Sequence, residues 1–186
     1  VGVAVAFLGI LLIAAATRHT GMPVSSALLW TRLLDAQAEL DPALVKAGFL
    51  FLVIGFGTKA GLAPMHNWLP DAHSQAPSPV SAIFSGCLLN SALYCILRCL
   101  PLAEGVSGHV GWARGVLVVF GLLSMGVAAG FLLLQRDLKR LLAYSSVEHI
   151  GILALGAGLG GLGAFATMLH MVGHALAKPL GFFCAG

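Results

Sequence analysis

Charged residues are scarce in this sequence. Asp, Glu, Lys and Arg make up only 9% of its 186 residues, whereas a soluble domain carries about 25%. Hydrophobic residues make up 59%, and the mean hydropathy is +0.96. This composition excludes an ordinary water-soluble domain, and the small, scattered net charge of +3 does not suggest binding to nucleic acid. We therefore predict an integral membrane protein whose surroundings are the lipid bilayer.

Common catalytic and redox motifs are absent as well. The sequence has no Ser/His/Asp or Cys/His constellation, and no glycine-rich phosphate loop next to a strand. Its four cysteines form no CxxC pair, and we expect them to be buried as small apolar residues: Cys87, Cys95, Cys99 and Cys184. Nothing in the sequence could ligate an iron–sulfur cluster. We expect no catalytic residue, no metal and no cofactor in this chain.

Long apolar runs dominate what is present. A membrane-spanning helix needs about 20 apolar residues, and continuous runs favour helices over the alternating pattern of a barrel. The sequence begins and ends inside such runs, so we expect residues 1–186 to be a single transmembrane domain and an internal fragment of a longer chain. We predict an all-α partial bundle of about six transmembrane helices, at residues 1–16, 43–63, 80–100, 114–134, 137–157 and 164–186.

The second apolar run is interrupted in an unusual way. The sequence at residues 55–81 is GFGTKAGLAPMHNWLPDAHSQAPSPVS, with Lys59 deep in the run and Gly61 and Pro64 just after it. Proline removes a backbone N–H and its ring clashes with the preceding turn, so we predict a helix break near Pro64. An unbroken helix over residues 43–69 would be roughly 40 Å long, too long for a hydrocarbon core of about 30 Å. An ionisable residue beside a helix break indicates a transport site.

Titratable residues recur along the last run. His170, His174 and Lys178 are spaced four apart, so they share one face of a helix. Histidine exchanges protons near neutral pH, which makes this row a candidate proton relay; the alternative is that the histidines only pack. Glu148 and His149 lie near the middle of the preceding helix and point about 100° apart. Glu148 either joins the relay or forms a structural ion pair with the row.

Three further polar residues are candidate accessories. His66 and His73 follow the break and either feed protons from the cytoplasm or are merely loop residues. Asn90 could hold a water molecule on the helix at residues 80–100. The loop at residues 135–140 holds three Lys or Arg residues. By the positive-inside rule, this loop and the loop at residues 64–79 are predicted to be cytoplasmic.

Four stretches carry a resemblance to a known family: KAGLAPMHNWLPDAH, LLNSALYCILR, LLLQRDLKRLLAYSSVEHIGI and HMVGHALAKPLGFF. They resemble the antiporter-like proton-translocating membrane subunits of respiratory complex I, multisubunit Na⁺/H⁺ antiporters and membrane-bound hydrogenases. The branch they look most like is component F of hydrogenase-4.

The resemblance implies a larger inverted-repeat fold of about fourteen helices in which each repeat has one discontinuous helix. It makes Lys59 the central lysine of the first discontinuous helix, with a glutamate partner upstream of Val1. It makes the row from His170 to Lys178 the connection between two half-channels. Many complex I relatives have lysine where this chain has Asn90, so water held by Asn90 would have to substitute.

The function implied is that of a non-catalytic, proton-translocating subunit of a redox-driven complex in a prokaryotic inner membrane. The complex would be of the hydrogenase-4/formate-hydrogenlyase or NADH:quinone oxidoreductase type. Its other membrane subunits and a peripheral redox arm would be the partners, and they would hold the cofactors. The alternatives are a Na⁺/H⁺ antiporter subunit, a subunit that only scaffolds its complex, and a transition-metal transporter using His170 and His174, whose spacing suits a metal.

Overall fold

The computed structural model describes residues 1–106 and 111–186, and those residues form helices and turns with no strand. Four helical stretches are long and apolar enough to cross a membrane: Pro42–Ala60, Ser78–Val106, Trp112–Leu132 and Leu138–Leu159. Helix α1 (Gly2–Ala15) is apolar but shorter. The prediction of an all-α membrane fold is confirmed.

Each of the six predicted spans corresponds to helix in the structure. After α1 come α3 (Pro42–Ala60), the stretch from α5 (Ser78–Ile83) through a π-helical segment (Phe84–Leu88) into α6 (Leu89–Val106), then α7 (Trp112–Leu132), α8 (Leu138–Leu159) and α9 (Leu162–Cys184). The connector after α1 holds the short helix α2 (Trp30–Asp35) and a 3-10 turn at Gln37–Glu39.

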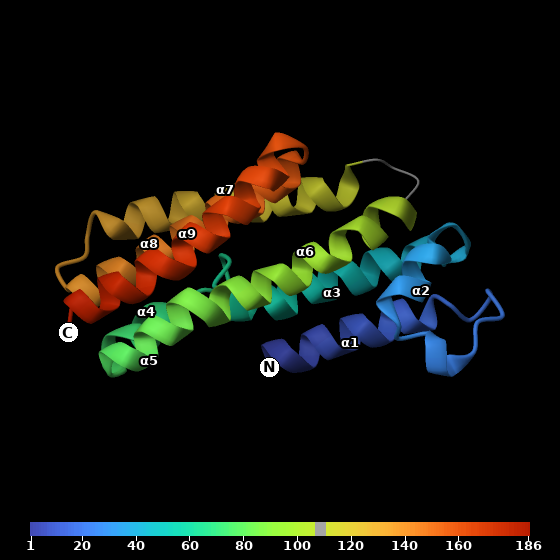
Figure 1. Cartoon of the computed structure of the whole chain (residues 1–186), viewed down its shortest axis with the longest axis horizontal. Coiled ribbons are helices and arrows are strands. Elements are labelled where there is room, and N and C mark those ends of the chain that lie inside the picture. The colour runs from blue at the N-terminus through green and yellow to red at the C-terminus, as the bar shows by residue number, and fades with distance from the viewer. Residues whose placement is uncertain (107–110) are drawn as a thin grey trace.

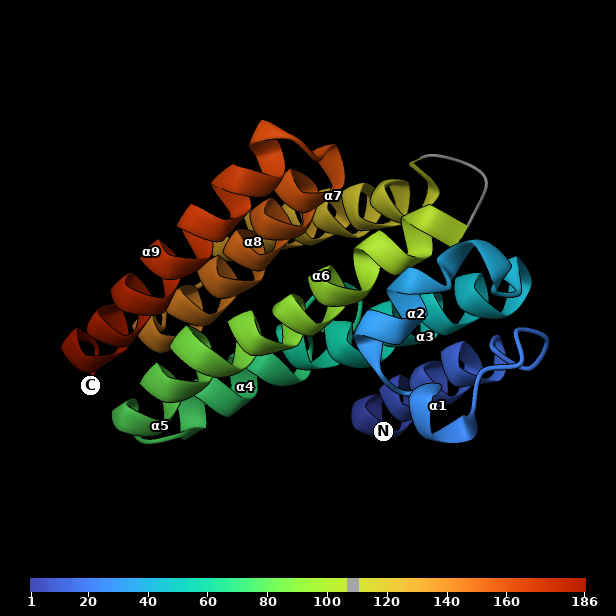
Figure 2. The ribbon, with the colours of Figure 1, turned by 45° about the vertical axis from the view of Figure 1, so that its right-hand side comes forward.

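The helices lie lengthwise in two groups (Figure 1). Helix α3 packs between α1 and α6 in one group, and α8 packs between α7 and α9 in the other. A large buried core joins the groups, with Phe49 of α3, Leu93 of α6, Leu117 of α7 and Ile150 of α8 all fully buried. The turned view of Figure 2 shows α4 (Trp68–Gln75) and α5 at the end of the molecule nearest the C-terminus. There α4 contacts α8 and α5 contacts α9.

Glycine permits the closest helix contacts. A Cβ atom at Gly55 of α3 would lie 2.3 Å from the backbone nitrogen of Ala6 of α1, and one at Gly121 of α7 would lie 2.8 Å from the carbonyl oxygen of Gly151 of α8. Neither position could hold a larger side chain without moving a backbone. Membrane helices associate through such small residues because lipid provides no hydrophobic drive between them.

Some sequence-based boundaries were wrong. Residues 68–75, predicted to be loop, form α4, because Pro70 lies in the first turn where its missing N–H is not needed. Helix α6 continues through Pro101 to Val106 instead of ending at residue 100, since spanning helices tolerate proline where neighbouring groups satisfy the backbone.

The expected burial of the cysteines was also wrong. Cys87 and Cys184 are exposed and Cys95 and Cys99 are half-buried, and all four are free thiols. A thiol is weakly polar, so an outward position on a membrane helix costs it little.

Candidate functional site

The break in the second span lies where the sequence predicted it. Helix α3 ends at Ala60, and Gly61 follows with a φ of 82°, in the left-handed region that glycine adopts most readily. The N–H groups of Gly61 and Leu62 both donate to the carbonyl oxygen of Gly57 at 2.9 Å. The chain then passes through Pro64, and helix α4 starts at Trp68. The discontinuous helix is therefore confirmed, with Gly61 and Pro64 at its break.

Side chains from outside the break satisfy its backbone. The N–H of Ala63 donates to Ser124 Oγ of α7 at 2.9 Å, and Ser124 is fully buried. Trp68 Nε1 donates to the carbonyl oxygen of Thr58 at 2.6 Å across the break. Non-helical backbone at membrane depth is tolerated only where protein or water satisfies it, and here protein does so.

Lys59 occupies the last turn of α3, directly before the break. Its side chain is exposed and forms no ion pair within residues 1–106 and 111–186. It borders a recess whose other walls are Val1, Gly2, Val3, Thr58 and Trp68. Lys59 therefore lies directly beside the helix break, as the sequence predicted, on a face of α3 bordered by the start of α1 and by Trp68.

Three histidines meet between α8 and α9. His149 Nδ1 and His170 Nε2 are 2.8 Å apart, and their rings stack with centroids 5.0 Å apart. The ring of His174 lies 5.5 Å from that of His149. A hydrogen bond between two imidazoles requires a proton on one nitrogen and none on the other, so this contact can pass a proton.

Lys178 continues the row one helical turn further. Its side chain is only 6% exposed. The ammonium nitrogen donates to the carbonyl oxygen of Leu142 at 3.1 Å and contacts Ser145 Oγ, both on α8. Both partners are neutral, so neither compensates the lysine's charge when it is protonated. No carboxylate lies within ion-pair distance of this lysine among the described residues. A buried cation without a direct ionic partner is costly, which marks it as a functional candidate.

His174 lies between the histidine pair and Lys178 along α9. It is buried, and neither ring nitrogen has a hydrogen-bond partner among the described residues. Buried polar atoms are nearly always bonded to protein or to ordered water. The ring nitrogens of His174 are therefore suited to bind ordered water, through which a proton can be transferred.

Glu148 does not share these contacts. It is half-buried on α8 and forms no ion pair within the part of the chain that the structure describes. The ion pair with the α9 row, one of the two alternatives expected, is not formed there. The adjacent His149 does contact α9, through His170.

The accessory residues are all buried. His73 is 1% exposed and stacks on Phe182 of α9 with centroids 4.9 Å apart, and neither of its ring nitrogens has a described partner. The ring of His66 lies 6.4 Å from that of Tyr144 of α8. Asn90 Nδ2 donates to the carbonyl oxygens of Gly86 (3.0 Å) and Met171 (3.1 Å), which ties α6 to α9. His73 lies within α4, whereas His66 lies in the turn between α3 and α4.

Four serines of the site were not predicted from the sequence. Besides Ser145 and Ser124, Ser85 and Ser146 are fully buried with their hydroxyl oxygens 2.9 Å apart, which joins the π-helical segment to α8. A signal was present in the adjacent Ser145 and Ser146 within an apolar run. Their partners lie on other helices, however, and spacing along one helix does not reveal them.

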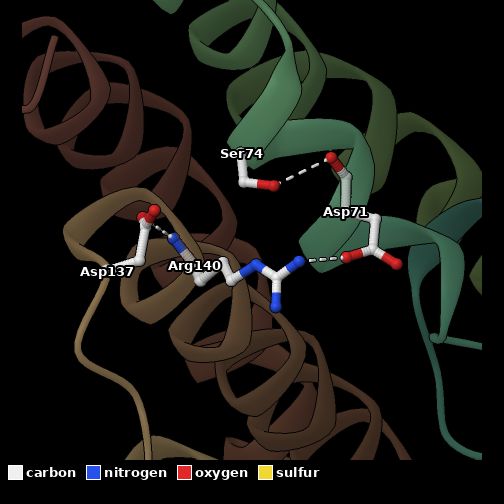
Figure 3. Close-up of polar contacts among 4 residues, drawn as sticks. All are labelled: Asp71, Ser74, Asp137 and Arg140. Carbon is white, nitrogen blue, oxygen red and sulfur yellow. Dashed lines mark hydrogen bonds and ion pairs between the residues drawn. The ribbon is translucent and has the colours of Figure 1, made fainter.

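An ion pair joins the second half of the broken helix to α8. Arg140 Nη2 lies 2.6 Å from Asp71 Oδ1 of α4, as Figure 3 shows. Asp137 caps the start of α8 by accepting from the Arg140 backbone N–H at 3.0 Å. The pair links α4 to the helix that carries His149.

Comparison with known proteins places this chain in a family. Residues 2–186 match the family described as "NADH:quinone oxidoreductase/Mrp antiporter, TM". The whole chain is 46% identical to "Hydrogenase-4 component F homolog" of Methylacidiphilum infernorum and covers 39% of that protein. It is 37% identical over 80% of its length to hydrogenase-4 component B of Escherichia coli, covering 24% of that protein. The resemblance to hydrogenase-4 components is confirmed.

Solved structures show the same fold. The chain superposes with a TM-score of 0.85 at 31% identity on a chain of the membrane-bound sulfane sulfur reductase, an archaeal respiratory membrane complex, with 98% of this chain and 36% of that one covered. The TM-score with a chain of the Mrp complex from Dietzia is 0.77 at 23% identity, covering 97% and 33%. In each comparison this chain spans well under half of its relative. The chain therefore belongs to the NADH:quinone oxidoreductase/Mrp antiporter family of membrane subunits.

Proposed function

We propose that this chain translocates protons across a prokaryotic inner membrane as part of a subunit of a redox-driven complex. The observation that carries the proposal is the row of titratable side chains between α8 and α9. It runs from the bonded pair of His149 and His170, past the buried His174, to the buried Lys178. Three contiguous imidazole rings that end at a buried lysine support a relay over a packing role alone.

The chemistry of the row is a series of proton hops. A proton moves between His149 Nδ1 and His170 Nε2 along their 2.8 Å contact. His174 accepts it next, through water where the rings are not in direct contact. Lys178 Nζ receives it in turn, with the Leu142 carbonyl and the Ser145 hydroxyl holding the ammonium in place. Neutral imidazole and neutral amine are the accepting forms.

The remaining candidates have roles at the ends of this row. Lys59 acts as a switch at the helix break, where its charge responds to a partner carboxylate. His66 and His73 supply protons from the cytoplasmic side. Glu148 offers a further proton acceptor on α8, and Asn90 holds water between α6 and α9.

We assign the redox cofactors to partner chains of the same complex. Relatives are named as components of hydrogenase-4 and as subunits of NADH-quinone oxidoreductase. We infer that the chain works beside other membrane subunits, with a peripheral arm that carries the cofactors of a hydrogenase-4/formate-hydrogenlyase or NADH:quinone oxidoreductase type of complex. Its own role is not catalytic.

The test is proton uptake by the full-length protein in its complex, reconstituted in vesicles with redox turnover measured in parallel. The variant that replaces His170, His174 and Lys178 with alanine should assemble but lose proton uptake. Lys59→Ala should uncouple uptake from turnover. His19→Ala, in the exposed connector after α1, is the matched control and should pump normally. If the triple variant pumped protons undiminished and coupled to redox turnover, the proposed relay would be excluded. The chain would then serve only as a scaffold for its complex.

Two alternative functions would transport a different ion, sodium or a transition metal. The Mrp complex of Dietzia shares the fold, so sodium uptake in the same vesicles is the measurement that distinguishes a Na⁺/H⁺ antiporter subunit. A transition-metal transporter would need more ligands than His170 and His174, and no group of three or more His, Cys, Asp or Glu side chains suited to a metal lies within the described residues. Transport that survives exhaustive chelation would dispose of the metal alternative.

A further inference from the structure

Two aromatic side chains hold a cationic side chain of α6, Arg98, beside the short helix α2. Arg98 lies 20 residues after Ser78 in one continuous helical stretch, roughly 30 Å along it. That is about the thickness of the hydrocarbon core, so Arg98 lies at the far membrane surface if Ser78 lies at the near one. Trp30 of α2 and Tyr94 of α6 flank it, and Trp and Tyr are the residues enriched at this depth.

The arginine is held in one orientation. Its guanidinium carbon lies 4.1 Å from the centre of the Trp30 ring, and its Nη1 donates to the Tyr94 hydroxyl at 3.0 Å. Trp30 Nε1 donates in turn to the Arg98 carbonyl oxygen at 2.8 Å. An arginine stacked on an aromatic face is preorganised to bind an anion with its remaining N–H groups.

Arg98 has no acidic partner within residues 1–106 and 111–186. Its side chain is exposed. Four of the five guanidinium N–H donors remain available after the bond to Tyr94, by the donor inventory of arginine. A fixed, unpaired cation at this depth is complementary to a phosphate, which arginine recognises through two parallel hydrogen bonds.

An apolar groove of about 190 Å³ opens beside this cation. Trp30 forms part of its wall as well as the platform under Arg98. Its other walls include Ile10 and Ile13 of α1, Leu52 of α3, Leu102 of α6 and Leu28 of the connector. Ile10 and Leu28 are 38% and 62% exposed, so the groove opens to the surface of the chain.

We propose that this groove and Arg98 form a binding site for one anionic phospholipid. The phosphate lies on the guanidinium of Arg98, and one acyl chain lies in the groove between α1, α2 and α6. The charge of Arg98 favours an anionic lipid such as phosphatidylglycerol over zwitterionic phosphatidylethanolamine. The bound lipid would fasten the short helix α2 to the transmembrane helices.

The test uses the full-length protein in its purified complex, with retained lipid measured by native mass spectrometry after addition of phosphatidylglycerol or phosphatidylethanolamine. Arg98→Ala should lower retention of phosphatidylglycerol about tenfold, the effect of losing charge-assisted hydrogen bonds. Arg32→Ala is the matched control, since Arg32 is an exposed arginine of α2, the helix that carries Trp30, and it should retain lipid as the wild type does.

A second variant separates binding from folding. Ile10→Trp narrows the groove while leaving the stack of Arg98 on Trp30 intact, and it should lower retention of both lipids. Equal retention by Arg98→Ala and Arg32→Ala would overturn the proposal. So would unchanged retention in Ile10→Trp, or a structure of the complex in which a protein segment fills the groove.

Discussion

Lys178 is held by neutral groups, a carbonyl oxygen and a hydroxyl, and not by a carboxylate. This arrangement lets the lysine gain and lose a proton without breaking an ion pair. Deleting the amine removes the proton carrier, whereas deleting the hydroxyl of Ser145 removes only one of its two supports. The two residues should therefore differ in how much transport they support.

We predict that Lys178→Met abolishes proton uptake and that Ser145→Ala lowers it by about fivefold, the effect of one hydrogen bond of about 1 kcal/mol. The measurement is the initial rate of proton uptake at equal redox turnover in reconstituted vesicles. Ser74→Ala is the control, because that hydroxyl donates only to the Asp71 carbonyl oxygen on α4 (Figure 3). Equal losses in both serine variants would contradict a specific role for Ser145.

Spacing along the sequence predicted part of this site at the residue level. His170, His174 and Lys178 share a face of α9 because of their separation of four, and this needs no tertiary information. The contact of His149 with His170 depends on how α8 and α9 pack against each other. Neighbouring helices can slide by a turn with the same pattern, so this register could not be predicted from the sequence.

The broken helix depends on one backbone conformation. Gly61 has a φ of 82°, and a Cβ atom there would lie 2.6 Å from Leu69 Cδ1 of α4. A left-handed residue other than glycine costs roughly 1–2 kcal/mol. The break should therefore be sensitive to the smallest possible side chain at this position.

We predict that Gly61→Ala lowers the free energy of unfolding by about 1–2 kcal/mol, measured by denaturant titration in detergent. The control is Gly126→Ala in α7, where a Cβ atom would meet nothing within 4 Å. That change should be neutral or stabilise by about 0.5–1 kcal/mol, since glycine weakens a helix interior. A stabilised Gly61→Ala variant would show that the break is not held in this conformation.

The ion pair of Asp71 with Arg140 joins two elements but is exposed. Their side chains are 70% and 43% exposed, and exposed pairs contribute less than about 1 kcal/mol. A double-mutant cycle with Asp71→Ala and Arg140→Ala should give a coupling energy below that value, measured by denaturant titration. The coupling should fall further in high salt. A coupling of several kcal/mol would mean that the pair is shielded from water in the complete complex.

The existence of the helices was predictable and some of their limits were not. Apolar runs located all six long helical stretches, because lipid forces the backbone to satisfy itself. Four of them are long and apolar enough to cross a membrane. Two prolines were misinterpreted in the sequence, since Pro70 lies in the first turn of α4 and Pro101 lies within α6. The π-helical segment at Phe84–Leu88 could not be predicted from the amino-acid composition of that stretch.

At the scale of the whole molecule, the arrangement of helices sets two opposite surfaces. The α4–α5 corner and the turn between α7 and α8 lie at the end where the C-terminus lies, whereas α2 and the rest of the connector after α1 lie at the other end (Figure 1). This agrees with the prediction that the loops at residues 64–79 and 135–140 lie on the same side of the membrane. Which surface is cytoplasmic rests on the basic residues at 135–140, so the orientation is a prediction that labelling can test.

We predict that a cysteine at Gln75, exposed at the end of α4, is labelled from the cytoplasm only, and one at His19, exposed after α1, from the opposite side only. The measurement is reaction with a membrane-impermeant maleimide in intact cells and in inverted vesicles. The background protein has its four free cysteines replaced with serine or alanine. Three Lys or Arg residues in the short turn oppose its translocation, which is the physical basis of the orientation. Reversed labelling would show that the chain has the opposite orientation in the membrane. His66 and His73 would then supply protons from the other side of the membrane.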